Sequence, residues 1–426
     1  MKRSLFFFLL LFPVLYSYAQ EITYENRIYD PNIETVLLYK AGNQLSDPVI
    51  KLNSNDKLWL SFDDFSNETY RFKYTFIHCN EFWEPSDLRQ IDYLDGYFEG
   101  EILDYHFSLN AIPGYIHYTH VFPDNDMNIK LSGNYILKVY VNNDSDENVL
   151  FTRRFYVVEP MMATVEAEIP YYPKKLEYTR KKQQIDLRIL TPDLFNAEPK
   201  QRISITIQQN GRWDNAKMGI KATSVLMNEL QYNFRDGIVF DGGNEFRHFD
   251  MKSFLYQSMY IKQIISTKDG YEVFLHTDYP RTKKPYETLD DINGKELIKA
   301  RQDQITMIEG EYAYVDFTLK QPEIADADIY ILGAINEWQL DDKSKMTYDS
   351  RTRSYHARLF LKQGYYDYLY AVVPRGLFTG DITIIEGDHW ETRNSYTVYV
   401  YYKERVPEYD RLIGYRRFNS FEISIR

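Results

Sequence analysis

Apolar and polar residues alternate over many short segments of this chain, as they do in strands with one buried and one wetter face. The segment 70–78 is the clearest case, because every second residue is aromatic and the residues between are mostly polar. Further strands are expected at 35–39, 58–62, 135–141, 151–158, 163–169, 185–189, 203–207, 271–275, 312–319, 328–333, 355–360, 366–372 and 396–402. After the first residues, no window of about a dozen residues keeps a helical stripe. The pattern predicts an all-β fold.

Turns and proline breaks divide these strands into three stretches. The first ends near Glu159 and Pro160, and the alternation resumes at Ala163. A polar, charged segment over 279–304 predicts a long loop. Short strands at this spacing are typical of immunoglobulin-like sandwiches. We therefore predict three β-sandwich domains in series, over residues 20–160, 161–305 and 306–426.

The first residues have the pattern of an export signal. Lys2 and Arg3 precede an apolar run over 5–16, and small residues follow up to Ala19. This run is shorter than the ~20 residues that a membrane-spanning helix needs. We expect a signal peptide over residues 1–19 that is cleaved after Ala19, so that the mature chain is exported.

Composition and charge narrow the range of partners. The chain has 39 tyrosines among 426 residues, and tyrosine favours strands and half-buried binding faces. Its formal net charge is −12, whereas a nucleic-acid surface needs clustered Lys and Arg to neutralise phosphates. The composition therefore favours β-sheet and binding surfaces, and the charge argues against nucleic acid as a partner.

Few residues of the sequence are candidates for catalysis or metal binding. Cys79 is the single cysteine, and an exported chain with one cysteine cannot form intrachain disulfides. Its neighbour His78 points to the opposite side of a strand and cannot easily act as its base, so Cys79 is interpreted as buried and structural. His117 and His120 also fall on opposite faces of a strand, which argues against a zinc site.

Enzyme motifs are absent from the sequence. It has no HExxH, no G-x-S-x-G elbow, no Walker loop and no dinucleotide fingerprint. The acidic pairs Asp63–Asp64, Asp290–Asp291 and Asp341–Asp342 could serve glycoside hydrolysis, but adjacent acids in turns are usually solvated. We assign no catalytic residue, no metal site and no cofactor, and expect a protein that is not an enzyme.

The third predicted domain contains a more specific pattern. Residues 328–338, followed by 346–348 and 364–370, resemble the glycogen- and starch-binding early-set modules. In that family a tryptophan stacks on a sugar ring and a lysine makes a second contact. Asn336 and Trp338 match the sugar-contact segment, but Leu369 stands at the lysine position. The resemblance implies an early-set sandwich. Trp338 is interpreted as a packing residue in preference to a sugar contact.

A second resemblance spans nearly the whole mature chain. A series of motifs, in order and with sensible spacing, is similar to the type IX secretion system plug proteins of Bacteroidetes. They are Phe76–Asn80, Trp83–Leu88, Tyr93–Tyr97, Tyr115–Tyr118 with Pro123, Leu131–Tyr135, Gly243–Asp250, Asp291–Gly294, Glu386–Asp388, Glu391–Asn394 and Tyr409–Tyr415.

The resemblance to plug proteins implies a periplasmic, non-enzymatic protein. It would seal the periplasmic opening of the giant outer-membrane β-barrel translocon (the SprA/Sov type) when cargo is absent, with no small-molecule substrate. Exposed aromatic residues often anchor interfaces, so the candidate contacts with that partner are Phe82, Trp83, Asp87 and Tyr93. A packing corner explains the Trp83 loop equally well. The alternative function is a periplasmic glycan-binding module that uses the C-terminal domain.

Overall fold

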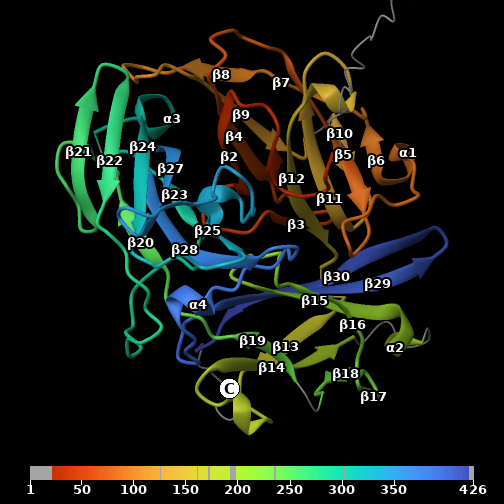
Figure 1. Ribbon diagram of the computed structural model, residues 1–426. Helices are drawn as coiled ribbons and strands as arrows, with labels where there is room; N and C mark the ends of the chain where they lie inside the picture. The colour runs from red at the N-terminus through yellow and green to blue at the C-terminus, as the bar shows by residue number, and fades with distance from the viewer. Residues whose placement is uncertain are drawn as a thin grey trace, which may run out of the picture.

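The computed structural model describes residues 22–124, 126–160, 162–170, 173–191, 198–234, 237–301 and 303–421 (Figure 1). The expected signal peptide lies outside these residues. The described part is mostly β-strand, which confirms the predicted all-β class. Its short helices are α1 Gln90–Tyr93, α2 Pro199–Arg202, α3 Thr306–Glu309 and α4 Thr383–Glu386, with 3-10 turns η1 Asp146–Asn148, η2 Leu176–Tyr178 and η3 Ala334–Asn336. None of the described helices is long and apolar enough to cross a membrane.

Two sheets enclose the first hydrophobic core, and we call them the N-terminal sheet pair. One sheet has the order β1 (Arg27–Ile28), β12 (Val149–Val158), β11 (Gly133–Tyr140), β5 (Phe72–Cys79) and β7 (Gly100–Ile102), with β3 (Val49–Lys51) parallel to β12. The other has the order β2 (Ile33–Lys40), β4 (Leu58–Asp64), β9 (Ile116–Phe122) and β8 (Asp104–Phe107). A small ladder joins β6 (Leu94–Gly96) to β10 (Met127–Ile129). Alternate residues of these strands, among them Phe62, Phe76, Tyr118 and Phe155, fill the core.

A second core lies between two further sheets, the central sheet pair. One has the order β13 (Thr164–Glu168), β14 (Lys182–Leu190), β18 (Glu229–Tyr232) and β17 (Ser224–Leu226), with β19 (Ile238–Asp241) also beside β14. The other has the order β16 (Lys217–Ile220), β15 (Ile203–Gln209), β29 (Ser395–Arg405) and β30 (Glu408–Asn419). Ile205, Val398 and Ile413 are fully buried between them.

The third core belongs to strands that lie between β19 and β29 in the chain, which we call the inserted sheet pair. One sheet places β28 (Gly364–Pro374) beside β20 (Arg247–Asp250), β23 (Glu296–Ile298) and β25 (Ala327–Leu332). The other has the order β21 (Ile261–Thr267), β22 (Gly270–Leu275), β24 (Tyr312–Leu319), β27 (Ser354–Lys362) and β26 (Thr347–Asp349). Phe249, Phe317 and Tyr368 pack between these sheets.

The last hairpin departs from the predicted order of domains in series. We predicted that residues 306–426 form one sandwich, whereas β29 pairs with β15 and β30 pairs with β29, so that this hairpin closes the central sheet pair. Alternation in 396–402 identifies a strand but does not identify its neighbour, because pairing depends on contacts far away in the sequence. The hairpin also contacts β12, so it lies beneath the N-terminal sheet pair as well (Figure 1).

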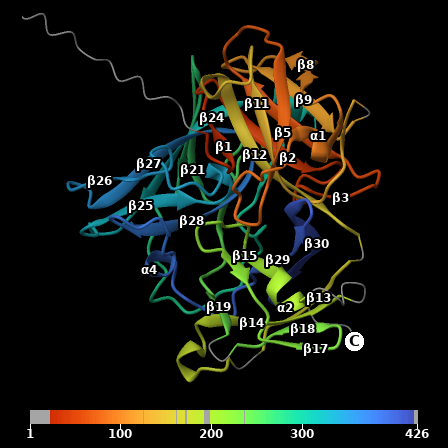
Figure 2. The same cartoon turned by 90° about the vertical axis from the view of Figure 1, so that its right-hand side faces the viewer.

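The three sheet pairs pack against one another. Figures 1 and 2 show the N-terminal and inserted sheet pairs side by side above the central one. A separate apolar cluster fills the contact between the N-terminal and central pairs, with members such as Val49, Tyr156, Tyr399 and Leu412. The molecule is therefore held together by contacts between sheet pairs as well as by the cores within them.

Candidate functional site

The Trp83 loop packs at the contact between the N-terminal and central sheet pairs. Trp83 is only 3% exposed, and its ring lies 5.3 Å from that of Tyr156. The Arg154 guanidinium lies between two indoles, 4.4 Å from the ring of Trp83 and 4.5 Å from that of Trp213. Stacking of a cation on aromatic faces is favourable where water is excluded. Of the two interpretations of the Trp83 loop, the burial of the ring favours the packing corner over an exposed interface contact.

The other three candidate contacts divide by exposure. Tyr93 is buried, and its hydroxyl donates to the Phe76 carbonyl oxygen at 3.1 Å. Phe82 is 48% exposed with one ring edge against Gly219 of β16, and Asp87 is exposed. Only Phe82 and Asp87 of the four are thus available to another molecule.

Cys79 and His78 lie on β5 in closed surroundings. Both side chains are buried. Burial raises the pKa of the Cys79 thiol to about 12, so almost none of it is ionised at neutral pH. Burial lowers the pKa of His78 to about 4, and its Nδ1 lies 2.9 Å from the Ser86 hydroxyl. The arrangement lacks the thiolate that a nucleophile requires.

A buried ionic cluster connects the N-terminal and inserted sheet pairs. Asp63 of β4 accepts hydrogen bonds from His117 Nδ1 at 2.5 Å, the Tyr312 hydroxyl at 2.5 Å and Lys362 Nζ at 2.6 Å. The Asp63 and Lys362 side chains are each 1% exposed. Burial alone would raise the pKa of Asp63, but Lys362 and His117 outweigh it and hold that pKa below its ordinary value. The expectation that adjacent acids are solvated loop residues was wrong for Asp63.

His117 and His120 lie in different surroundings. His117 hydrogen-bonds to Asp63, whereas the His120 ring lies 4.6 Å from Tyr74. Among the described residues, no group of three or more His, Cys, Asp or Glu side chains is placed to hold a metal ion.

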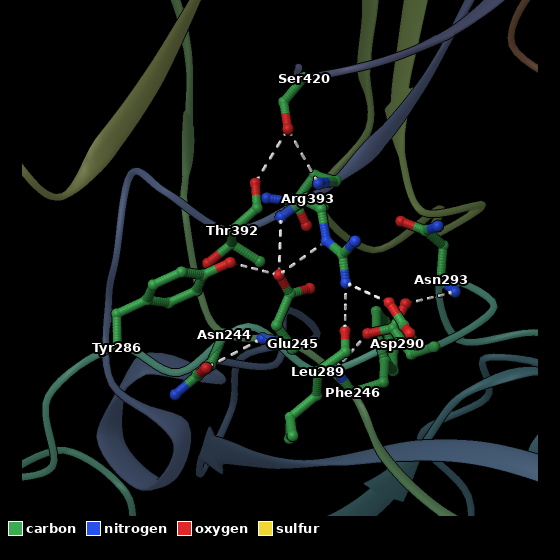
Figure 3. A network of polar contacts seen from close by, with 12 residues as sticks. Asn244, Glu245, Phe246, Tyr286, Leu289, Asp290, Asn293, Thr392, Arg393 and Ser420 are labelled. Atoms are coloured by element: carbon green, nitrogen blue, oxygen red, sulfur yellow. Dashed lines mark hydrogen bonds and ion pairs between the residues drawn. The ribbon is translucent and has the colours of Figure 1, made fainter. Parts of the chain in front are cut away.

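Motifs that are far apart in the sequence converge where the inserted and central sheet pairs join (Figure 3). Glu245 is 1% exposed and accepts a hydrogen bond from the Tyr286 hydroxyl. Its Oε1 also accepts from the backbone N–H and Nε of Arg393, at 3.3 and 3.4 Å. Arg393 Nη2 then donates to the Leu289 carbonyl oxygen at 2.5 Å and to Asp290 at 3.0 Å. The Glu245 carboxylate therefore ties the long 279–304 segment to the residues that lead into β29.

Glu386 of α4 is the centre of a second ionic group at this junction. It is fully buried and accepts from Arg281 Nε at 2.7 Å, Arg247 Nε at 3.0 Å and the Tyr370 backbone N–H at 3.0 Å. Arg247 also donates to Asp278 at 2.6 Å. Burial would raise the pKa of Glu386, but the two guanidinium groups outweigh it and lower the pKa below its ordinary value. Each buried charge here has an opposite partner, as stable burial requires.

A pair of carboxyl groups fixes the turn at Asp291–Gly294. Asp291 Oδ2 accepts from the Phe246 N–H at 2.6 Å. Asp367 is fully buried, and its Oδ2 accepts from the N–H groups of Ile292 at 2.7 Å and Gly294 at 3.1 Å. Burial raises the pKa of Asp367 to about 8, with the nearby Asp291 adding to the effect, and burial raises that of Asp291 to about 6. Asp367 is thus mostly protonated at neutral pH.

This carboxyl pair predicts a loss of stability as the pH rises. The folded pKa of Asp367 lies above the ordinary value of ~3.9, so its stabilising effect is complete below about pH 4 and declines up to about pH 8. Asp367→Asn cannot titrate, so its urea midpoint should fall less than that of the wild type between pH 5 and pH 9. Asp87→Asn, at an exposed position, is the control and should follow the wild type. Parallel curves for Asp367→Asn and the wild type would contradict the assignment.

The candidate sugar contacts lie beside this turn. The Trp338 ring is 6.1 Å from that of Phe246. Gly294 has φ +76°, and a Cβ there would lie 2.4 Å from the Trp338 ring, so only glycine allows this close approach. Asn336 Oδ1 accepts the Gly333 N–H at 3.0 Å within the η3 turn. These contacts fit the packing interpretation of Trp338, and sugar binding stays the disfavoured alternative.

A cavity of about 200 Å³ lies where the three sheet pairs meet. Arg153, Lys295, Glu337 and Trp338 are among its lining residues. Arg153 Nη2 donates to Glu337 at 2.6 Å across the N-terminal and inserted pairs. This direct ion pair at the cavity wall joins the N-terminal and inserted sheet pairs.

Sequence reasoning missed the ionic groups between sheet pairs. Lys362 and Arg153 each occupy a strand, where a charged residue is ordinarily assigned to the solvent face. The signal that could have found Arg153 is its place in the apolar run of β12, where an unpaired charge would be costly. Their acidic partners could not be chosen from the sequence, because they lie in other sheet pairs.

A family model described as the first domain of the type 9 secretion system plug protein matches residues 33–159, which span β2 to β12. The chain is similar to a hypothetical protein from Parabacteroides merdae of known crystal structure, with 32% identity and a TM-score of 0.89. The match covers 94% of this chain and 100% of that one. Dimeric latent PorU from Porphyromonas gingivalis aligns at 8% identity over 91% of this chain and 34% of its own, with a TM-score of only 0.16. No curated protein matches.

Proposed function

Because this chain belongs to the family of type 9 secretion system plug proteins, we propose that it binds the outer-membrane translocon of that system and closes its periplasmic opening. The observation that carries the proposal is the family match over the N-terminal sheet pair. The partner is a giant outer-membrane β-barrel, and the seal forms when no cargo occupies the channel. The protein acts by a binding equilibrium and not by a reaction.

The ion pairs between the sheet pairs support this role. A seal over a wide channel must resist deformation, and separate sandwiches on flexible linkers would not. Here the Asp63–Lys362 and Arg153–Glu337 ion pairs join the N-terminal and inserted sheet pairs. The Glu245–Arg393 pair ties the inserted pair to the central one. The three sheet pairs therefore form one thick body.

The location and the absence of catalysis belong to the same proposal. An export signal over residues 1–19 would deliver the chain to the periplasm, where the mouth of the translocon opens. Plug proteins need no catalytic residue, and the closed surroundings of Cys79 fit a non-enzymatic role. Of the candidate contacts, we retain Phe82 and Asp87, because both are exposed.

A permeability assay in the source bacterium tests the function. Deleting the gene should make the outer membrane leaky to large solutes, such as a periplasm-excluded fluorescent dextran. Deleting the translocon as well should restore the barrier, because the leak passes through the unplugged channel. A copy with Asp87→Lys should seal less well than the wild type, while Asp269→Lys, exposed on the turn between β21 and β22, should seal fully. An intact barrier in the single deletion would refute the proposal.

A further inference from the structure

The edge strand β8 presents apolar side chains to solvent. β8 is the last strand of the sheet β2-β4-β9-β8, and among the described residues it pairs with β9 alone. Leu103 is 62% exposed, Tyr105 42% and Phe107 62%. Figure 1 places β8 at the upper rim of the molecule, far from the central sheet pair.

These side chains form a continuous surface with the aromatic core. The Tyr105 ring lies 5.9 Å from that of Phe107 and 5.6 Å from that of the buried Tyr118. The Tyr118 hydroxyl accepts the backbone N–H of Tyr70 at 3.2 Å, and the Tyr70 ring is itself 41% exposed. We call Tyr70, Leu103, Tyr105 and Phe107 the β8 edge surface. Its aromatic rings are held by the core and are ready to bind without much loss of conformational freedom.

Another edge of the molecule shows how such strands are usually protected. β21 pairs only with β22 among the described residues, and its exposed positions include Lys262, Gln263, Ser266 and Thr267. Charged and polar side chains on an edge discourage pairing with other chains. β8 also has exposed polar residues, Asp104 and His106. Leu103, Tyr105 and Phe107 alternate with them and place three large exposed apolar side chains together, which points to a binding function.

Charge and length define the partner that fits. Lys73 forms an ion pair with Glu99 at 2.8 Å, so the charges left on the neighbouring segments are the acidic Glu68, Glu101 and Asp104 against Arg71. A complementary segment therefore carries Lys or Arg. The open edge is only four residues long, the length of β8. It does not continue past β8, because the N–H of Leu109 donates to the Ile308 carbonyl oxygen at 2.7 Å. Most of the affinity must then come from apolar side chains and not from backbone hydrogen bonds.

We propose that the β8 edge surface receives an extended segment of the translocon protein, with apolar residues at alternate positions and basic residues beside them. The segment adds to the sheet as a short strand next to β8, and its apolar side chains cover Tyr105 and Phe107. The inference rests on the proposed function, since the translocon is the partner named there. It adds a second contact area, at the opposite end of the N-terminal sheet pair from the Phe82 loop.

Co-purification from detergent-solubilised outer membranes tests the inference. Tagged full-length protein should recover the large barrel, and the double variant Leu103→Glu/Phe107→Glu should recover about tenfold less, as loss of a central apolar contact produces. The control is Gln263→Glu/Ser266→Glu, which adds the same charges to the β21 edge and should recover the wild-type amount. Circular dichroism and thermal melting establish that each variant is folded.

Two readouts separate the possible failures. Wild-type protein that recovers no barrel would overturn the proposed function. Wild-type and β8 variant that recover equal amounts would overturn only this inference. Tyr105→p-benzoylphenylalanine tests the same surface without a destabilising change. This variant should photo-crosslink to an extended segment of the barrel protein. Crosslinks to lipid or to a second copy of this chain would overturn the inference in favour of membrane contact or self-association.

Discussion

Asp63→Ala should lower the free energy of unfolding by about 3–5 kcal/mol, the usual cost of removing one partner of a buried ion pair. The substitution leaves the Lys362 ammonium buried without its carboxylate and the His117 ring without its acceptor, while the Tyr312 hydroxyl keeps only Thr35 as a partner. Urea denaturation at pH 7, followed by circular dichroism, measures the change. The loss should be large because water does not reach the pair, whose side chains are each 1% exposed.

Two comparisons make the Asp63 experiment specific. Asp316→Ala breaks the solvent-exposed pair with Arg358 and should cost less than about 1 kcal/mol. Asp63→Asn combined with Lys362→Met removes both charges and should recover part of the lost stability. The folded pKa of Asp63 lies below its ordinary value, so its contribution is present above about pH 4 and is lost as the pH falls through the folded pKa. The gap between wild type and Asp63→Ala should therefore close in acid, and a constant gap would contradict the ion-pair account.

Trp83→Ala should also cost about 3–5 kcal/mol, the range for truncating a large buried aromatic side chain. It removes the ring that packs on Tyr156 and on the Arg154 guanidinium between the N-terminal and central sheet pairs. Thermal melting of purified protein measures the loss. The neighbouring change Phe82→Ala, at a side chain that is 48% exposed, should cost less than about 1 kcal/mol.

The Trp83 result separates packing from docking. Below its melting temperature, the Trp83→Ala protein should still co-purify with the translocon, because the ring is not available to a partner. Unchanged stability together with lost co-purification would show instead that Trp83 contacts the translocon directly.

The strands could be predicted from the sequence, but most of their neighbours could not. Alternation over 70–78 predicted β5 to within two residues, because the side chains of a strand alternate between core and solvent. The same rule found residues 396–402, and it could not show that their partner is β15. Periodicity is local, whereas pairing depends on which apolar faces meet after the chain has folded.

The segments that form the candidate site could be identified from the sequence, but their convergence at one position in the fold could not. Gly243–Asp250, Asp291–Gly294 and Glu391–Asn394 stood out as matching segments, and the structure brings all three to one junction (Figure 3). Nothing in the spacing of Glu245 and Arg393 indicates that they form an ion pair. Trp83 was singled out for its residue type, and residue type alone cannot distinguish an aromatic anchor from a packed one.

The pairing of β15 with β29 determines when the central sheet pair can fold. Ile203 must find Tyr402 before the central sheet pair can close, so that pair waits until the end of the chain has emerged. Domains generally fold from the N-terminus as synthesis and export proceed, and the N-terminal and inserted pairs contain all their own strands. A copy that is cut short near its end keeps both of these but leaves β15 with an open edge, a feature that invites aggregation and proteolysis. The protein is therefore fully folded, and protected from aggregation and proteolysis, only after the β29–β30 hairpin has paired with β15.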